Sequence, residues 1–133
     1  MTLWVGSLWV TGFMVAPVLF ASLDDRSLAG TLAGELFGIT AWLGLACGAV
    51  LLLANRLRSA GVGWRAWVVA AMLALVCIGQ FVLTPMIAEL RMAGMAGTPR
   101  FGQLHGLASL LFVVTAVLGL SLVAAGQERR ISP

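Results

Sequence analysis

Charged residues are confined to short gaps in this chain, and four apolar stretches separate those gaps. No Asp, Glu, Lys or Arg occurs in residues 1–23, 36–55, 66–88 or 101–127. A membrane hydrocarbon core about 30 Å thick is crossed by roughly 20 residues of α-helix, because each residue advances the helix by about 1.5 Å. Each stretch reaches that length, so the pattern predicts four membrane-spanning helices.

The expected helices are joined by short connections, which favour antiparallel packing of neighbours in sequence. The predicted spans are 2–23, 31–54, 66–88 and 104–125. The first span lacks the basic start and the small-residue cleavage site of a signal peptide, so we expect it to be retained. The sequence therefore predicts an all-α, four-helix membrane bundle that forms one domain over residues 1–133.

Composition supports this class. The mean hydropathy is +1.04, with 61% hydrophobic and 10% charged residues, whereas soluble domains carry about 25% charged residues. All eight basic residues are arginines that flank helices without forming a patch, so we expect a lipid bilayer and no nucleic acid as partner. Cys47 and Cys77 lie within apolar stretches, where cysteine usually acts as a small hydrophobic side chain.

The distribution of arginine predicts the orientation, because cytoplasmic loops are enriched in basic residues. The side that holds both termini carries five arginines, Arg56, Arg58, Arg65, Arg129 and Arg130, and the other side carries three, Arg26, Arg91 and Arg100. Both termini are therefore predicted to be cytoplasmic. Trp4, Trp64 and Trp67 fall at the inner edges of their spans and are predicted to be interfacial anchors.

Small residues recur along the second span at intervals of three or four. The glycines of this stripe are Gly30, Gly34, Gly38, Gly44 and Gly48. Close approach of helix backbones is a main source of association in lipid, where the hydrophobic effect between helices is lost. The stripe predicts a packing surface, either within the bundle or between copies of the chain.

The first and third spans share a short pattern. Phe13 to Pro17 resembles Phe81 to Pro85, and both segments place a proline near the outer end of a span. Proline inside a helix removes a hydrogen bond and kinks the axis. The pattern raises the hypothesis of a duplicated helical hairpin. Gln80 is also expected to bond across to a neighbouring helix.

Polar side chains from several helix ends are predicted to meet at the outer face. The candidate ligand-binding residues are Glu35, His105, Glu89, Arg26 and Arg100. Glu35 is placed about one turn inside its span, where a carboxylate is costly unless it is paired or faces water. It could pin helix ends as an ion pair or form part of a binding site, and both interpretations stay open.

His105 is the only histidine of the chain, so one copy cannot provide two histidine ligands to haem. A dimer could do so, and a His–Met pair could also bind haem. Met86, Met92 and Met95 are expected on the same face as His105, and thioether and imidazole groups suit a soft ion such as copper. Copper and haem are therefore the candidate cofactors, against the simpler interpretation of ordinary core methionines and a structural histidine.

Several short motifs resemble one known family. They are Trp4-Val5-Gly6, Ala16-Pro17-Val18-Leu19-Phe20, Ala29-Gly30, Leu36-Phe37 and His105-Gly106. The chain resembles, over nearly its whole length, the transmembrane protein 205-like family, also called domain of unknown function 4149. It is also distantly similar to copper-resistance D membrane domains. The resemblance implies a small four-span protein, in bacteria of the inner membrane, and makes metal handling worth testing. It leaves open whether a segment precedes Met1.

Three functions fit the sequence. The first is a non-enzymatic membrane protein that handles a small ion, with metal as one option, or a polar ligand at its outer face. The second is an accessory or assembly subunit that packs on a larger membrane complex, or on another copy, through its glycine stripe. The third is a haem-binding membrane redox protein. No phosphate loop, nucleophile elbow or zinc spacing is present to indicate an enzyme.

Overall fold

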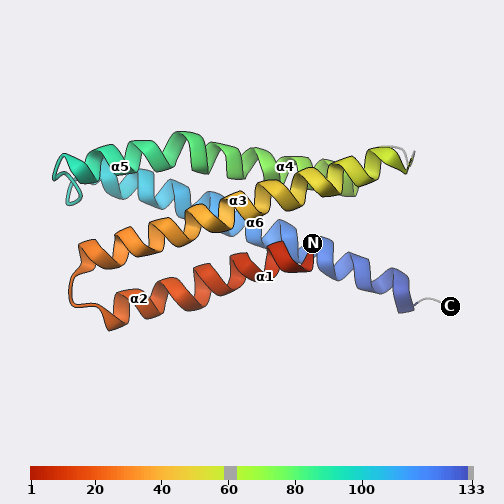
Figure 1. The fold of residues 1–133 in the computed structure, drawn as a ribbon, viewed down its shortest axis with the longest axis horizontal. Coiled ribbons are helices and arrows are strands. Elements are labelled where there is room, and N and C mark those ends of the chain that lie inside the picture. The colour runs from red at the N-terminus through yellow and green to blue at the C-terminus, as the bar shows by residue number, and fades with distance from the viewer. Residues whose placement is uncertain (59–62, 132–133) are drawn as a thin grey trace.

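The computed structural model describes residues 1–58 and 63–131, with side chains for residues 1–58 and 63–126. The described chain forms α-helices and two π-helical turns, and contains no strand. Four helical segments are long and apolar enough to cross a membrane. The chain is therefore a multi-pass membrane protein with the predicted all-α, four-helix architecture (Figure 1).

The first and third spans each consist of two α-helices joined by a π-helical turn. The first span comprises α1 (Thr2–Val10), η1 (Thr11–Val15) and α2 (Ala16–Ser22). The third comprises α4 (Trp64–Ile78), η2 (Gly79–Leu83) and α5 (Thr84–Met92). The second and fourth spans are the single helices α3 (Arg26–Leu57) and α6 (Pro99–Ile131).

The π turns lie where the sequence predicts proline kinks. Each is followed by an α-helix with proline as its second residue, Pro17 or Pro85. Proline has no N–H to donate to the preceding turn, and wide turns are one way in which a helix absorbs that loss. The Thr84 hydroxyl also donates to the Gly79 carbonyl at 3.0 Å, which adds a bond across η2.

The even-numbered spans begin earlier than the hydropathy pattern predicts, because their first turns are polar but capped. The second span starts at Arg26 rather than 31, and a carboxylate oxygen of Asp25 accepts hydrogen bonds from Ser27 N–H at 2.8 Å and Leu28 N–H at 3.2 Å. The fourth starts at Pro99 rather than 104. The 32 residues of α3 extend about 48 Å, so this helix is longer than the thickness of a hydrocarbon core of about 30 Å.

The tightest packing lies toward the end of the bundle that holds the N-terminus. The buried cluster comprises Trp4, Leu8, Val69, Met72, Ala116 and Leu122. It draws together α1, α4 and α6, and the second half of α3 packs at its edge through Cys47 and Leu51. The described core therefore joins all four spans at one end only.

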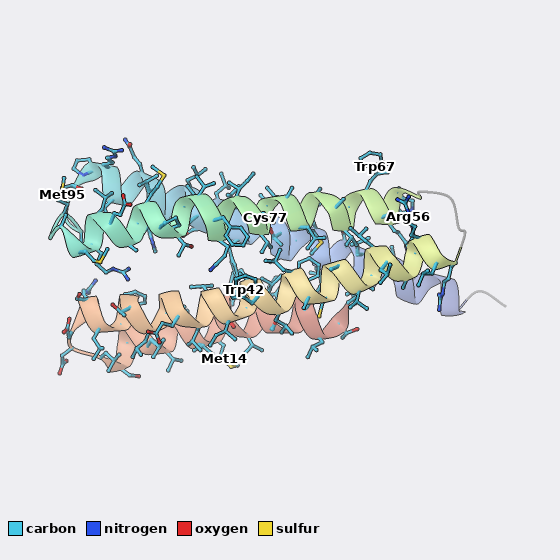
Figure 2. The ribbon with its side chains drawn as sticks, turned by 45° about the horizontal axis from the view of Figure 1, so that its top comes forward. Met14, Trp42, Arg56, Trp67, Cys77 and Met95 are labelled. Carbon is cyan, nitrogen blue, oxygen red and sulfur yellow. The ribbon has the colours of Figure 1, made fainter. Side chains whose placement is uncertain are left out.

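At the opposite end the bundle separates into two hairpins. Helix α2 packs on α3, and α5 packs on α6, but neither pair packs closely on the other. Figure 1 shows the resulting divergence of α2 and α3 from α5 and α6. Met95 lies at this end, and Arg56 lies at the other, as Figure 2 shows. We call the end with Met95 the outer end, following the predicted orientation.

Trp4 differs from its sequence-based prediction as an interfacial anchor. Its side chain is fully buried, with 0% of its surface exposed. The ring lies against Gly44 of α3, which leaves room for it because glycine has no side chain. Trp64 and Trp67 are 53% and 68% exposed, as interfacial residues should be, and Figure 2 shows Trp67 pointing away from the bundle.

Candidate functional site

The glycine stripe of α3 divides into two parts with different neighbours. In the inner part, Gly44 faces the Trp4 ring, and a Cβ added to Gly48 would lie 2.5 Å from Leu73 Cδ2. Both glycines are buried. These two positions hold helices close together within one bundle, as small residues commonly do in membranes.

In the outer part, polar side-chain tips replace the packed neighbours. A Cβ added to Gly30 would lie 3.4 Å from Arg91 Nη2, and one added to Gly34 would lie 4.0 Å from Arg91 Nη1. One added to Gly38 would lie 3.9 Å from Gln80 Nε2. We call this surface, formed by Gly30, Gly34, Gly38, Gln80 and Arg91, the outer seam.

Arg91 spans the space between the two hairpins. Its backbone belongs to the last turn of α5, its guanidinium reaches the glycines of α3, and its Cζ atom lies 5.9 Å from the centre of the Phe101 ring on α6. The side chain is partly buried. Among the side chains that the structure describes, no carboxylate lies within 4.0 Å of it. Within the described residues, the outer seam therefore contains a cation that has a cation–π contact and no carboxylate partner.

Gln80 lies on the same span as Arg91, deeper in the membrane. Its side chain is partly buried and lies beside Gly38. It was expected to bond across to a neighbouring helix, but it forms no hydrogen bond with the described residues. Its amide thus adds an available donor and acceptor to the outer seam.

The candidate residues from the sequence lie at the outer end but are not drawn into this seam. Glu35, His105, Glu89, Arg26 and Arg100 are all exposed, and no ion pair or side-chain hydrogen bond joins them in the described part of the chain. The His105 ring instead stacks on Phe101, with ring centres 6.1 Å apart and planes 3° apart. This stacking joins residues one turn apart on α6.

The candidate metal ligands are spread along the outer end. Met86 is partly buried, whereas Met92 and Met95 are 81% and 42% exposed. No three His, Cys, Asp or Glu side chains gather to hold a metal ion in the part of the chain searched. A copper site built from His105 and these methionines stays a prediction.

Arg91 and Gln80 were not among the site residues selected from the sequence, although a signal for them exists. They are spaced about three turns apart in a regular α-helix, which places them on one face of the third span. The glycine stripe of the second span offers a surface of matching length. The polar face of the third span could pack on the glycine face of the second span, but the sequence does not show which faces of the two helices meet.

Comparison with known families gives a match that covers the first three spans. The family model for the domain of unknown function 4149 (DUF4149) matches residues 1–96. The chain belongs to this family. All residues of the outer seam fall within the DUF4149 match, whereas His105 and Arg100 lie beyond it. Searches of the curated proteins and of the solved structures found no match.

Proposed function

We propose that this DUF4149 protein is a non-enzymatic protein of the bacterial inner membrane that binds a small anion, or the anionic group of a polar ligand, in the outer seam. The carrying observation is the Arg91 guanidinium, held between the two hairpins without a carboxylate partner in the described chain. Both termini are taken as cytoplasmic because five arginines lie on their side and three on the other. The seam then opens to the outside.

The chemistry of the seam supports an anion. A partly buried charge without a partner is costly, and an arriving anion offsets that cost through charge-assisted hydrogen bonds. The three glycines allow a ligand to approach the backbone of α3. Gln80 offers a further hydrogen bond at the deep end of the seam.

The test compares two cysteine substitutions at the same depth. Cys47→Ser and Cys77→Ser remove the native thiols, and Gly38→Cys or Ile39→Cys then places one thiol on α3. Gly38 faces the outer seam, whereas the next residue, Ile39, is 66% exposed on the surface of the bundle. If the seam is wet, a membrane-impermeant thiol reagent added outside labels Gly38→Cys in proteoliposomes and leaves Ile39→Cys unlabelled in hydrocarbon.

Inorganic phosphate then serves as the anion probe. It should slow the labelling of Gly38→Cys, and Arg91→Gln should abolish that protection. Arg100→Gln is the matched control, because Arg100 is an exposed arginine of the same end outside the seam. No labelling of the purified Gly38→Cys protein, or protection that survives Arg91→Gln, would contradict the proposal.

The same assay in native membranes bears on the alternative of an accessory or assembly subunit. A partner that packs on the stripe would shield Gly38→Cys in membranes, and purification would restore its labelling. That result would favour the subunit function over an open anion site.

A further inference from the structure

A cavity lies at the end of the bundle opposite the outer seam. It has a volume of about 570 Å³ and is formed where α1 begins, α3 ends, α4 begins and α6 approaches its last turns. In Figure 1 the inner parts of α3 and α6 diverge beyond the N-terminus, and α1 does not extend between them. Cavities that hold small molecules have volumes of roughly 300–1,000 Å³, so this space is large enough for a ligand.

The walls of the cavity combine hydrocarbon with the Arg65 guanidinium and the polar side chains of Thr2 and Asn55. Leu51, Leu52, Val69 and Leu122 contribute apolar surface, and the Arg65 side chain lies among them. The Nε and Nη2 atoms of Arg65 are buried from solvent and have no hydrogen-bond partner in the described chain. Leaving such donors unpaired is costly, particularly on a charged group.

The two unpartnered nitrogens of Arg65 indicate which chemical group the cavity can bind. Nε–H and Nη2–H lie along one edge of the planar guanidinium, which is the fork that binds two oxygens of a phosphate or carboxylate. Nη2 would lie 3.7 Å from a Cβ added to Gly126, so a side chain at that position would cover the fork. This edge of Arg65 therefore offers two N–H donors to the two oxygens of one phosphate or carboxylate.

The depth of Arg65 indicates a lipid. Arg65 follows Trp64 directly, its Cζ lies 5.7 Å from the centre of the Trp64 ring, and Trp64 and Trp67 are both largely exposed. Exposed tryptophans at a helix end mark the level of the lipid headgroups. A headgroup phosphate at that level would meet the Nε–Nη2 edge of Arg65, and the acyl chains below it would meet the leucines and valine of the cavity wall.

We infer that this cavity binds one anionic phospholipid of the inner leaflet, with its phosphate on the Nε–Nη2 edge of Arg65 and an acyl chain along the apolar wall. Basic pockets between transmembrane helices bind anionic headgroups by the same combination of contacts. The inference is independent of the outer seam, since it uses different residues at the other end of the bundle.

The test uses native mass spectrometry of the whole chain in a mild detergent, titrated with phosphatidylglycerol or with phosphatidylcholine of the same acyl chains. We expect the first bound lipid to be phosphatidylglycerol, with a preference that Arg65→Gln lowers about tenfold or more, as loss of a charge-assisted bond predicts. Arg56→Gln is the control, because Arg56 is exposed at the same end of the bundle (Figure 2). It should retain the preference.

A second variant keeps the charge and blocks the fork. Gly126→Val places a branched side chain over Arg65 Nη2 and should lower the same preference without removing an arginine. Equal binding of the two lipids by the native chain would overturn the inference, as would a preference unchanged in both Arg65→Gln and Gly126→Val. An equal loss in Arg56→Gln would reveal general surface attraction instead. Displacement of the lipid by millimolar inorganic phosphate would show a site for a free anion, and would also overturn it.

Discussion

The same substitution at two glycines of one stripe should have opposite effects on stability. At Gly44, an alanine Cβ would lie 2.8 Å from Trp4 Cε2 and 3.2 Å from Cδ1, and closer still to Nε1. Trp4 is fully buried, so its ring cannot move aside without disturbing the core. At Gly34, the nearest neighbour of the added Cβ is Arg91 Nη1 at 4.0 Å, which is ordinary contact with a flexible tip.

The magnitudes follow from two opposing effects. Adding a methyl group to a packed core costs about 1–3 kcal/mol, and replacing glycine by alanine inside a helix stabilises it by roughly 0.5–1 kcal/mol. Gly44→Ala should therefore lower the free energy of unfolding by about 1–2 kcal/mol on balance. Gly34→Ala meets no obstruction and should raise it by about 0.5–1 kcal/mol.

The assay is reversible unfolding in mixed micelles of detergent and sodium dodecyl sulfate, followed by far-UV circular dichroism. Gly48→Ala provides an intermediate case, because the obstructing atom is the end of the Leu73 side chain, which can change rotamer. Gly44→Ala as stable as the native chain would refute the packing account of the inner stripe. A destabilising Gly34→Ala would show that the outer stripe is packed in a way the structure does not contain.

Three further predictions follow from the topology and the polar contacts. A reporter fused after residue 133 should show a cytoplasmic C-terminus, and a periplasmic signal would place the outer seam in the cytoplasm. The Thr11 and Thr40 hydroxyl oxygens lie 3.1 Å apart and form a hydrogen bond between two spans. Thr40→Val should therefore lower the free energy of unfolding by about 0.6 kcal/mol, which is typical of hydrogen bonds between membrane helices. In a double-mutant cycle, adding Thr11→Val should lower it little further. Glu35 and His105 are exposed and form no ion pair in the described chain. Glu35→Gln and His105→Ala should therefore each change the free energy of unfolding by less than about 0.5 kcal/mol. A loss of several kcal/mol in each single mutant, with rescue in the double mutant, would reveal a structural pair.

The number and type of spans could be read from the sequence because the bilayer fixes the length of an apolar helix. The residues at which helices start were predicted less accurately, because the first turns of α3 and α6 are polar and lie outside the apolar stretches. Their caps, Asp25 and Thr98, are residues that also occur in loops. Hydropathy alone therefore places the membrane and leaves the helix ends several residues short.

The sequence near the glycine stripe does not show which residues pack against it. Periodicity shows that Gly30 to Gly48 share one face of α3, but their neighbours come from distant spans. Trp4 reaches the inner part from α1, and Arg91 reaches the outer part from α5. A tryptophan at a span edge is usually interfacial, so its burial against Gly44 could only be seen once the helices were assembled.

The two π turns give the repeated proline pattern a structural counterpart. In both odd-numbered spans a π turn comes just before a proline. Each π turn is followed by a helix that packs on the next span of its own hairpin, α2 on α3 and α5 on α6. Each hairpin is therefore joined internally at the outer end and joined to the other hairpin at the inner end. The buried inner core and the diverging outer ends place Arg91 between the two hairpins, and this arrangement accounts for a polar seam in a chain that is otherwise so apolar.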